Sequence, residues 1–133
     1  MSPRVLYVDD HEDTRALMRL VFTRSGYEVV MAGSASEALA QARNEEFEIY
    51  ILDNRLPDSS GVDLLVGLRE LDPHTPVVFY SGDGFDAHRQ SAMAAGAQAY
   101  LLKPCEPGEL LATVSRLIGE ANESAPPWPP RAP

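Results

Sequence analysis

Three aspartates, one serine and one lysine have the residue types and positions to form a charged site. Each follows a short apolar run: Asp9 and Asp10 follow VLYV, Asp53 follows FEIYIL, Ser81 follows VVFY and Lys103 follows AYLL. Carboxylates bind hard divalent cations, and hydroxyl and ammonium groups can donate hydrogen bonds to anions. Lys103 is the only lysine among eleven Lys and Arg residues. A compact ammonium on a flexible stem suits a point contact with an anion better than the planar arginine fork does.

If these carboxylates lie together, they need a cation. Two carboxylates about 4 Å apart repel each other by roughly 4 kcal/mol at an effective dielectric constant of about 20. Hard oxygen ligands without a His or Cys pair favour Mg²⁺, which takes one or two protein carboxylates and keeps several waters. His11 follows the acidic pair, but we interpret a lone histidine there as a solvated side chain. His74 and His88 have no evident chemistry. The clustered acids, without a pair of His or Cys ligands, therefore predict a magnesium site.

Each of these residues also has an ordinary structural interpretation. Asp10 can cap a helix, Asp53 can form an Asx turn before Pro57, and Ser81 can be a loop hydroxyl. Their common position at the ends of different apolar runs favours one shared site over three independent roles.

Five apolar runs rich in β-branched and aromatic residues predict five strands, at 5–8, 27–31, 47–52, 77–80 and 99–102. Helical spacing separates them, as in Ala16, Leu17, Leu20 and Val21, or in Leu110, Leu111, Val114, Leu117 and Ile118. Strands that alternate with helices pair in parallel through right-handed crossovers. The expected fold is a doubly wound α/β domain with a five-stranded parallel sheet and helices on both faces. Ligands of such sheets bind at the carboxyl ends of the strands.

Capping signals agree with this alternation. The segment from Ser34 to Glu37 has the pattern of a capping box, which predicts the start of a helix. Gly26, Gly96 and Gly119 stand where a glycine is expected just after a helix.

Length and composition indicate one globular domain at residues 1–120 and a proline-rich tail at 121–133. We expect the tail to be disordered or polyproline-like, and we favour an untethered tail over a docking motif anchored by Trp128. Cys105 is the only cysteine, which excludes an internal disulfide and favours a reducing, cytoplasmic setting. The apolar run near the N-terminus, VLYV at 5–8, is too short for a signal peptide or a membrane span. The net charge of −9 argues against direct nucleic-acid binding.

The sequence resembles the receiver domains of two-component response regulators over about residues 3–119. The resemblance rests on the acidic pair, on Asp53, Pro57 and Gly61 in D-x-x-x-P-x-x-x-G, on Ser81, and on Tyr100 three places before the Lys-Pro pair. It implies a flavodoxin-like (βα)5 fold with strand order 2-1-3-4-5.

The resemblance also implies a chemistry. Asp53 would accept a phosphoryl group from the phosphohistidine of a sensor histidine kinase or a histidine phosphotransfer protein. Mg²⁺ would be held by Asp10, Asp53 and the backbone carbonyl of Arg55, with Asp9 acting partly through water. Lys103 would contact the phosphoryl oxygens, and the peptide bond before Pro104 would be cis. Such a protein is a signalling switch with self-phosphorylation and autodephosphorylation activity, not an enzyme acting on other substrates.

Signal output would depend on Ser81 and Tyr100. Ser81 would move to bond the phosphoryl group, and the ring of Tyr100 would rotate into the vacated space. The surface formed by the fourth helix, the fifth strand and the fifth helix would then bind a downstream protein. Arg55 and Asp83 stand two places after Asp53 and Ser81, and we hypothesise that they approach each other and tune the lifetime of the phosphoryl group.

Alternatives remain open at this level. The chain could be a single-domain response regulator, the amino-terminal receiver of a longer regulator, or a scaffold that is never phosphorylated. A haloacid-dehalogenase-like phosphatase is disfavoured because that family has its nucleophile in D-x-D after the first strand. Gln98 and Ala99 replace the acidic residues that precede the strand-five aromatic in many dimerising receivers, so a monomer or weak dimer is expected.

Overall fold

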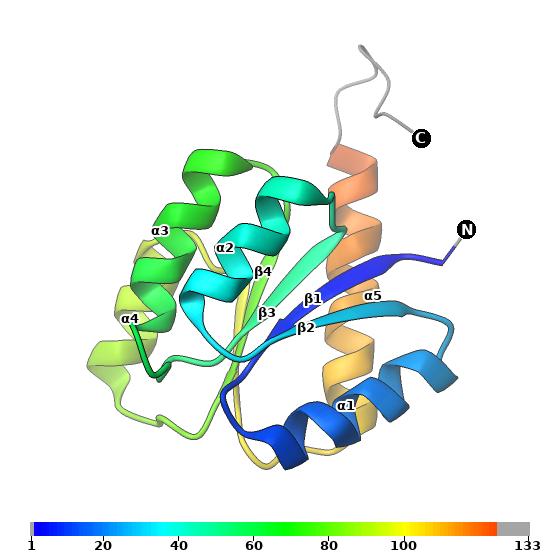
Figure 1. The fold of residues 1–133 in the computed structure, drawn as a ribbon, viewed down its shortest axis with the longest axis horizontal. Coiled ribbons are helices and arrows are strands. Elements are labelled where there is room, and N and C mark those ends of the chain that lie inside the picture. The colour runs from blue at the N-terminus through cyan, green and yellow to red at the C-terminus, as the bar shows by residue number, and fades with distance from the viewer. Residues whose placement is uncertain (1, 125–133) are drawn as a thin grey trace.

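In the computed structural model, which describes residues 2–124, strands and helices alternate strictly. The strands are β1 (Arg4–Val8), β2 (Glu28–Ala32), β3 (Ile49–Leu52), β4 (Val77–Ser81) and β5 (Ala99–Leu102). The helices are α1 (Glu12–Arg24), α2 (Ala35–Asn44), α3 (Gly61–Leu71), α4 (Asp86–Ala94) and α5 (Pro107–Ser124). All neighbouring strands pair in parallel in the order β2-β1-β3-β4-β5. The predicted doubly wound fold and strand order are confirmed (Figure 1).

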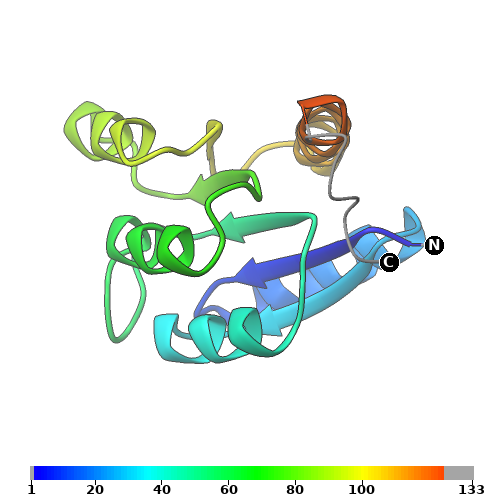
Figure 2. The same cartoon turned by 90° about the horizontal axis from the view of Figure 1, so that it is seen from above.

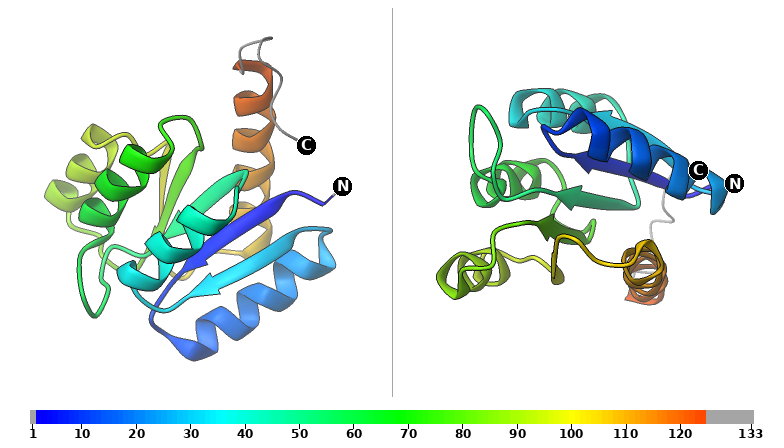
Figure 3. Two further views of the ribbon diagram at one scale, coloured as in Figure 1. Left: turned by 45° about the horizontal axis from the view of Figure 1, so that its top comes forward. Right: turned by 90° about the horizontal axis from the view of Figure 1, so that it is seen from below.

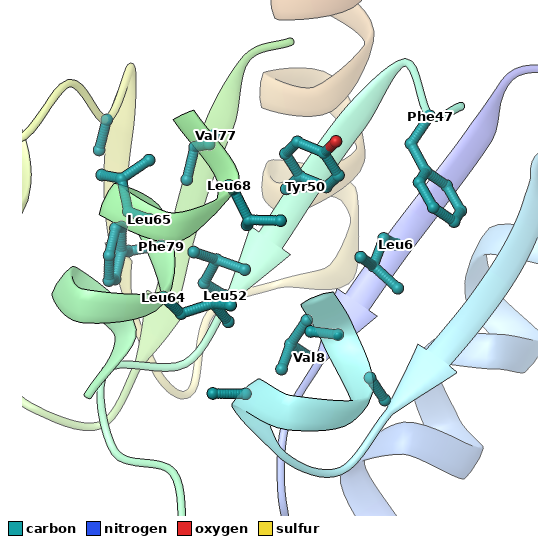
Figure 4. Packing of buried hydrophobic residues seen from close by; sticks show 14 of the residues in the cluster. Leu6, Val8, Phe47, Tyr50, Leu52, Leu64, Leu65, Leu68, Val77 and Phe79 are labelled. Carbon is teal, nitrogen blue, oxygen red and sulfur yellow. The ribbon is translucent and has the colours of Figure 1, made fainter. Parts of the chain in front are cut away.

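The helices form a layer on each face of the sheet. Seen from above, α2, α3 and α4 lie on one face, and α1 and α5 lie on the other (Figure 2). Each face has its own apolar core. The core under α2 and α3 joins inward residues of the central strands to helix leucines, as the side chains of Leu6, Leu52, Leu64, Leu68 and Phe79 illustrate (Figure 4). Burial on both faces explains why the strands read as apolar runs rather than as alternating ones.

The strand register brings the carboxyl ends of the strands to one edge. Val8 of β1 lies opposite Ala32 of β2 and Leu52 of β3. Ser81 of β4 lies opposite Leu102 of β5. The residues that follow β1, β3 and β5 therefore leave the sheet at the same edge, although they are far apart in the sequence.

Most capping predictions hold. The Ser34 side chain accepts a hydrogen bond from the backbone N–H of Glu37 at 3.1 Å and caps α2. Gly26 and Gly96 follow α1 and α4 with φ of 90° and 113°, in the left-handed region that glycine enters without strain. Both helices therefore end where the sequence predicts.

The end of α5 corrects two predictions. The helix continues past Gly119 and past the predicted boundary at residue 120, and it ends at Ser124. The predicted end is too early because the pattern places Gly119 just after the helix, whereas a glycine is tolerated inside a helix that packing stabilises. The rest of the predicted tail, with Trp128, lies outside the described residues. Within residues 2–124, every helix is too short or too polar to cross a lipid bilayer.

The buried face of α1 also differs from the simplest reading of its pattern. The helix lies beside β2 at one side of the sheet (Figure 3). Met18 and Phe22 are buried, whereas Leu17 and Leu20 are 53% and 49% exposed. Two overlapping apolar stripes at helical spacing are present in the sequence, and only the position of the helix on the sheet decides which stripe is covered.

Candidate functional site

Two buried aspartates are fixed at the carboxyl edge by the sheet itself. Asp9 and Asp53 are 1% and 5% exposed. The backbone N–H of Asp9 donates to the carbonyl of Ala32, and that of Asp53 donates to the carbonyl of Val8, each at 3.0 Å. These bonds continue the ladders beyond the last strand residues. The two side chains therefore extend from a rigid frame rather than from a loose loop.

The acids of β1 and β3 meet as the sequence predicts. Asp9, Asp10, His11 and Asp53 each offer one ligand atom, and these atoms lie within 4.8 Å of one another. Asp10 is partly exposed, so the group opens toward solvent. Three carboxylates that converge beside solvent fit the oxygen ligands and retained waters of Mg²⁺. The backbone N–H of Arg55 bonds Asp53 Oδ1 at 3.3 Å, which keeps its main chain nearby, but its carbonyl remains only a predicted ligand.

Lys103 reaches the acids from β5. Its Nζ donates to Asp9 Oδ2 and, at 3.0 Å, to Asp53 Oδ2. Its side chain is 19% exposed, and the Lys103–Pro104 peptide bond is cis. Burial alone would lower the pKa of Lys103, but the hydrogen bonds to Asp9 and Asp53 more than offset burial and raise it above the ordinary value. Lys103 thus supplies one of the positive charges that the clustered carboxylates need.

Ser81 lies against the other oxygen of Asp53. Its hydroxyl donates to Asp53 Oδ1 at 2.9 Å and accepts from the backbone N–H of Asp83 at 3.2 Å. Ser81 is 1% exposed. The two carboxylate oxygens of Asp53 therefore have different partners, a hydroxyl on one and an ammonium on the other.

Tyr100 connects β5 to the loop that follows β4. Its hydroxyl donates to the backbone carbonyl of Asp83 at 2.6 Å. Its ring stacks on Phe79, with the ring centroids 5.5 Å apart and 12° between the planes. Burial raises the pKa of Tyr100, so the hydroxyl stays protonated and can donate. A change in the position of Ser81 or of this loop would therefore reach Tyr100 directly.

The predicted approach of Arg55 to Asp83 is not made among the described residues. The Asp83 carboxylate is 2% exposed and contacts Asn54 Nδ2 at 3.3 Å, the N–H of Phe85 at 3.1 Å and the ring of His88. Arg55 is exposed and acts on Asp83 only as a more distant charge. The reason is local, because the loop turns Asp83 inward to bond the start of α4. Their role in phosphoryl lifetime stays a prediction.

Sequence reasoning missed Asn54 and His88. Asn54 is buried beside Asp53 and donates to Asp83. His88, read as having no evident chemistry, pairs with Asp83 from the first turns of α4. The spacing of five residues between Asp83 and His88 matches no helix or strand period, because a loop lies between them. The presence of an acid and a histidine flanking that loop was the only available signal.

We expect Asp83 to stabilise the protein above about pH 4 and to lose this effect in acid. Burial alone would raise the pKa of Asp83, but the amide of Phe85 and the ring of His88 more than offset burial and lower it. A group with a lowered folded-state pKa contributes stability above its unfolded pKa of about 3.9, and this is lost as pH falls through the folded value. The difference in urea-unfolding free energy between wild type and Asp83→Asn should shrink from about pH 6 to about pH 3.

The matched control for this measurement is Asp86→Asn. Asp86 is an exposed carboxylate in the first turn of α4. Its replacement changes the net charge by the same amount but leaves the contacts of Asp83 in place. A difference for Asp83→Asn that is constant over the pH range, or that shrinks equally for Asp86→Asn, would contradict the assignment.

Gly61 allows the chain to pass close to Asp53. Its N–H donates to the carbonyl of Asn54 at 2.9 Å. A Cβ at this position would lie 2.4 Å from the backbone oxygen of Asp53, 2.6 Å from the Phe79 ring and 2.9 Å from the Cα of Asn54. Since two of these atoms are backbone, the clash cannot be relieved by a side-chain rotation. The glycine of the D-x-x-x-P-x-x-x-G motif is thus a packing requirement of the site.

Gly61→Ala should therefore destabilise the protein by about 3 kcal/mol, because the backbone of Asp53 and Asn54 must move. Urea denaturation monitored by circular dichroism measures the change. Gly119→Ala is the control, since a Cβ there meets nothing within 4 Å inside α5. That substitution should stabilise by up to about 1 kcal/mol. Equal effects of the two variants would exclude the close approach as the cause.

The charged and polar side chains at the carboxyl ends of the strands line an open pocket of about 410 Å³. Its walls include Asp53, Ser81, Asp83, Lys103 and His11. The pocket walls thus offer carboxylates together with an ammonium and a hydroxyl. This arrangement can hold a divalent cation next to an anion and can present a carboxylate oxygen of Asp53 to an electrophile in the pocket.

Residues 5–115 match the family described as the response regulator receiver domain. Transcriptional regulatory protein PrrA of Mycobacterium tuberculosis is 36% identical over 124 residues, which cover 93% of this chain and 53% of that protein. Regulatory protein LuxO of Vibrio cholerae is 34% identical over 116 residues, which cover 87% of this chain and 26% of that protein. This chain therefore spans about half or less of the length of these relatives.

Solved structures are also similar. The response regulator receiver domain protein (CheY-like) from Methanospirillum hungatei has a TM-score of 0.91 and 30% identity, covering 94% of this chain and 100% of that chain. The signal receiver domain of a LuxO repressor protein from Vibrio parahaemolyticus has a TM-score of 0.86 and 25% identity, covering 92% and 95%. The range of this chain that matches the family, residues 5–115, includes Asp9, Asp10, Asp53, Ser81 and Lys103.

Proposed function

This chain belongs to the response regulator receiver domain family, and we propose that it is a phosphorylation switch in which Asp53 accepts the phosphoryl group. One observation supports this best. Asp53 is buried, its Oδ1 bonds Ser81 and its Oδ2 bonds Lys103. A carboxylate held between a hydroxyl and an ammonium, beside two further acids, matches the needs of phosphoryl transfer, which are positioning and charge neutralisation.

The proposed donor is a phosphohistidine of a sensor histidine kinase or a histidine phosphotransfer protein. A carboxylate oxygen of Asp53 forms a bond to phosphorus while the phosphorus–nitrogen bond of the donor breaks, and the electron pair returns to the donor imidazole. Lys103 moves its contact from the carboxylates to the phosphoryl oxygens, and Ser81 donates to another of them. Mg²⁺, held by Asp9, Asp10, Asp53 and the carbonyl of Arg55, would neutralise charge on the phosphoryl oxygens.

Output is proposed to pass through Ser81 and Tyr100. If Ser81 turns toward the phosphoryl group, it releases Asp53 and changes the loop whose carbonyl holds Tyr100. The surface of α4, β5 and α5 lies next to this loop. Exposed apolar side chains are present there, with Leu102 at 51%, Met93 at 40% and Phe85 at 67% exposure. Such residues suit a face that binds a protein.

The partners are therefore a phosphodonor and a target that recognises this face. The target is a separate protein or an output domain of the kind of longer regulator that the curated relatives represent. The lone cysteine supports a reducing, cytoplasmic setting. The acidic net charge supports protein partners over direct nucleic-acid binding, in a monomer or weak dimer.

Incubation with acetyl phosphate and Mg²⁺, followed by intact-mass measurement, tests the proposal. The expected result is a single phosphate adduct that forms only when Mg²⁺ is present. Absence of any adduct would favour a scaffold that is never phosphorylated. Continuous release of phosphate from unrelated phosphate esters would instead indicate a phosphatase.

A further inference from the structure

His11 lies in one cluster with Asp9, Asp10 and Asp53. The proposed function uses the three acids but gives His11 no role. It is the N-cap of α1, and its side chain is 69% exposed. Its backbone N–H donates to Asp9 Oδ1 at 2.9 Å. Its ring nitrogen Nδ1 lies 3.1 Å from Asp9 Oδ1 and 3.1 Å from Asp10 Oδ1. One nitrogen is thus equally close to the oxygens of two different carboxylates.

These distances match the spacing of ligands around a six-coordinate ion. Neighbouring ligands of an octahedral ion bound at about 2.1 Å lie about 3.0 Å apart. Nδ1 stands in this relation to an oxygen of Asp9 and to an oxygen of Asp10. Asp53 also places an oxygen within 4.8 Å of the other three ligand atoms. His11 therefore needs little movement to share a cation with the acids.

A hydrogen bond alone explains these contacts less well. Nδ1 has either one proton or one lone pair in the plane of the ring. A proton must be divided between the two oxygens, and a bare lone pair would face two negative groups. A shared cation satisfies the nitrogen and both carboxylates together.

We propose that His11 Nδ1 is a ligand of the same cation site and extends its range from Mg²⁺ to late first-row divalent cations such as Ni²⁺. The inference rests on the proposed function because it uses the same acids. Mg²⁺ prefers oxygen ligands, whereas imidazole favours Ni²⁺, Cu²⁺ and Zn²⁺. His11 lines the open pocket with Asp53 and Lys103, so a hydrated ion can reach it. The chain thus combines a magnesium-type set of acids with one nitrogen.

Calorimetric titration with Mg²⁺ and, separately, with Ni²⁺ tests the proposal on the wild type and on His11→Ala. Ni²⁺ affinity should fall by at least about tenfold in the variant, while Mg²⁺ affinity changes by less than about threefold. His74→Ala is the matched control because His74 is also exposed but has no part in the cluster. It should leave both affinities unchanged. Pulsed EPR with bound Cu²⁺ should show imidazole nitrogen coupling in the wild type that is lost in His11→Ala.

The outcomes separate this inference from the proposed function. Mg²⁺ binding that needs Asp10, with equal Ni²⁺ affinity in wild type and His11→Ala, would overturn the role of His11 and leave the magnesium switch intact. Equal loss of both affinities would also overturn it, since His11 would then act on the acids and not on the choice of metal. Failure of both metals to bind would count against the proposed function itself.

Discussion

We expect the Asp53→Asn protein to form no phosphate adduct with acetyl phosphate in the presence of Mg²⁺, under conditions in which the wild type forms a single adduct. The amide has nearly the shape of the carboxylate but is not a nucleophile toward phosphorus. Its oxygen can still accept from Ser81, so the fold should persist. Intact-mass measurement over time checks the loss, and circular dichroism checks the fold.

The matched control is Asp63→Asn. Asp63 is an exposed carboxylate in the first turn of α3, outside the pocket. It should be phosphorylated like the wild type. An adduct of undiminished yield in a folded Asp53→Asn protein would show that another group accepts the phosphoryl group and would refute the assignment of Asp53.

Lys103→Met should slow phosphorylation by about 10²- to 10³-fold, the usual effect of removing one preorganised charged donor from a transition state. Methionine keeps most of the apolar stem but removes the ammonium that bonds Asp9 and Asp53. Lys103→Arg keeps the charge but has a planar fork, and it should recover only part of the rate. The rate of adduct formation at saturating Mg²⁺ provides the measurement.

Metal binding distinguishes a chemical role of Lys103 from a structural one. An ammonium is not a metal ligand, so the affinity for Mg²⁺ in Lys103→Met should equal or exceed that of the wild type. Arg116→Met, on the exposed side of α5, controls for the loss of one positive charge. A slow reaction that merely reflects lost Mg²⁺ binding, or an unchanged rate, would contradict a direct contact of Lys103 with the phosphoryl group.

The sequence predicted the structure well wherever the signal lies within one short segment, such as an apolar run or a helix cap. The five apolar runs predicted the strands, because residues covered on both faces must be apolar. Ser34, Gly26 and Gly96 predicted helix ends, because capping is a local interaction between neighbours in the chain. Parallel pairing then placed Asp9, Asp53, Ser81 and Lys103 at one edge, since carboxyl ends of parallel strands align.

The sequence could not decide which partner a side chain takes once several lie within reach. Asp83 could have turned toward Arg55, but the loop after β4 turns it toward Asn54 and His88. His11 is solvated as predicted, with its side chain 69% exposed, but only the structure shows that the turn before α1 also brings its ring to both acids.

The order of the elements, most of their ends and the sheet edge that carries the charged residues were therefore predictable from the sequence alone. Period, capping and strand direction are properties of short segments, so they can be read without a structure. The buried stripe of α1, the close approach at Gly61 and the partners of Asp83 and His11 became visible only in the folded protein. Each of these features depends on how segments that are distant in the chain are placed relative to one another in space. No pattern within a single segment contains that information.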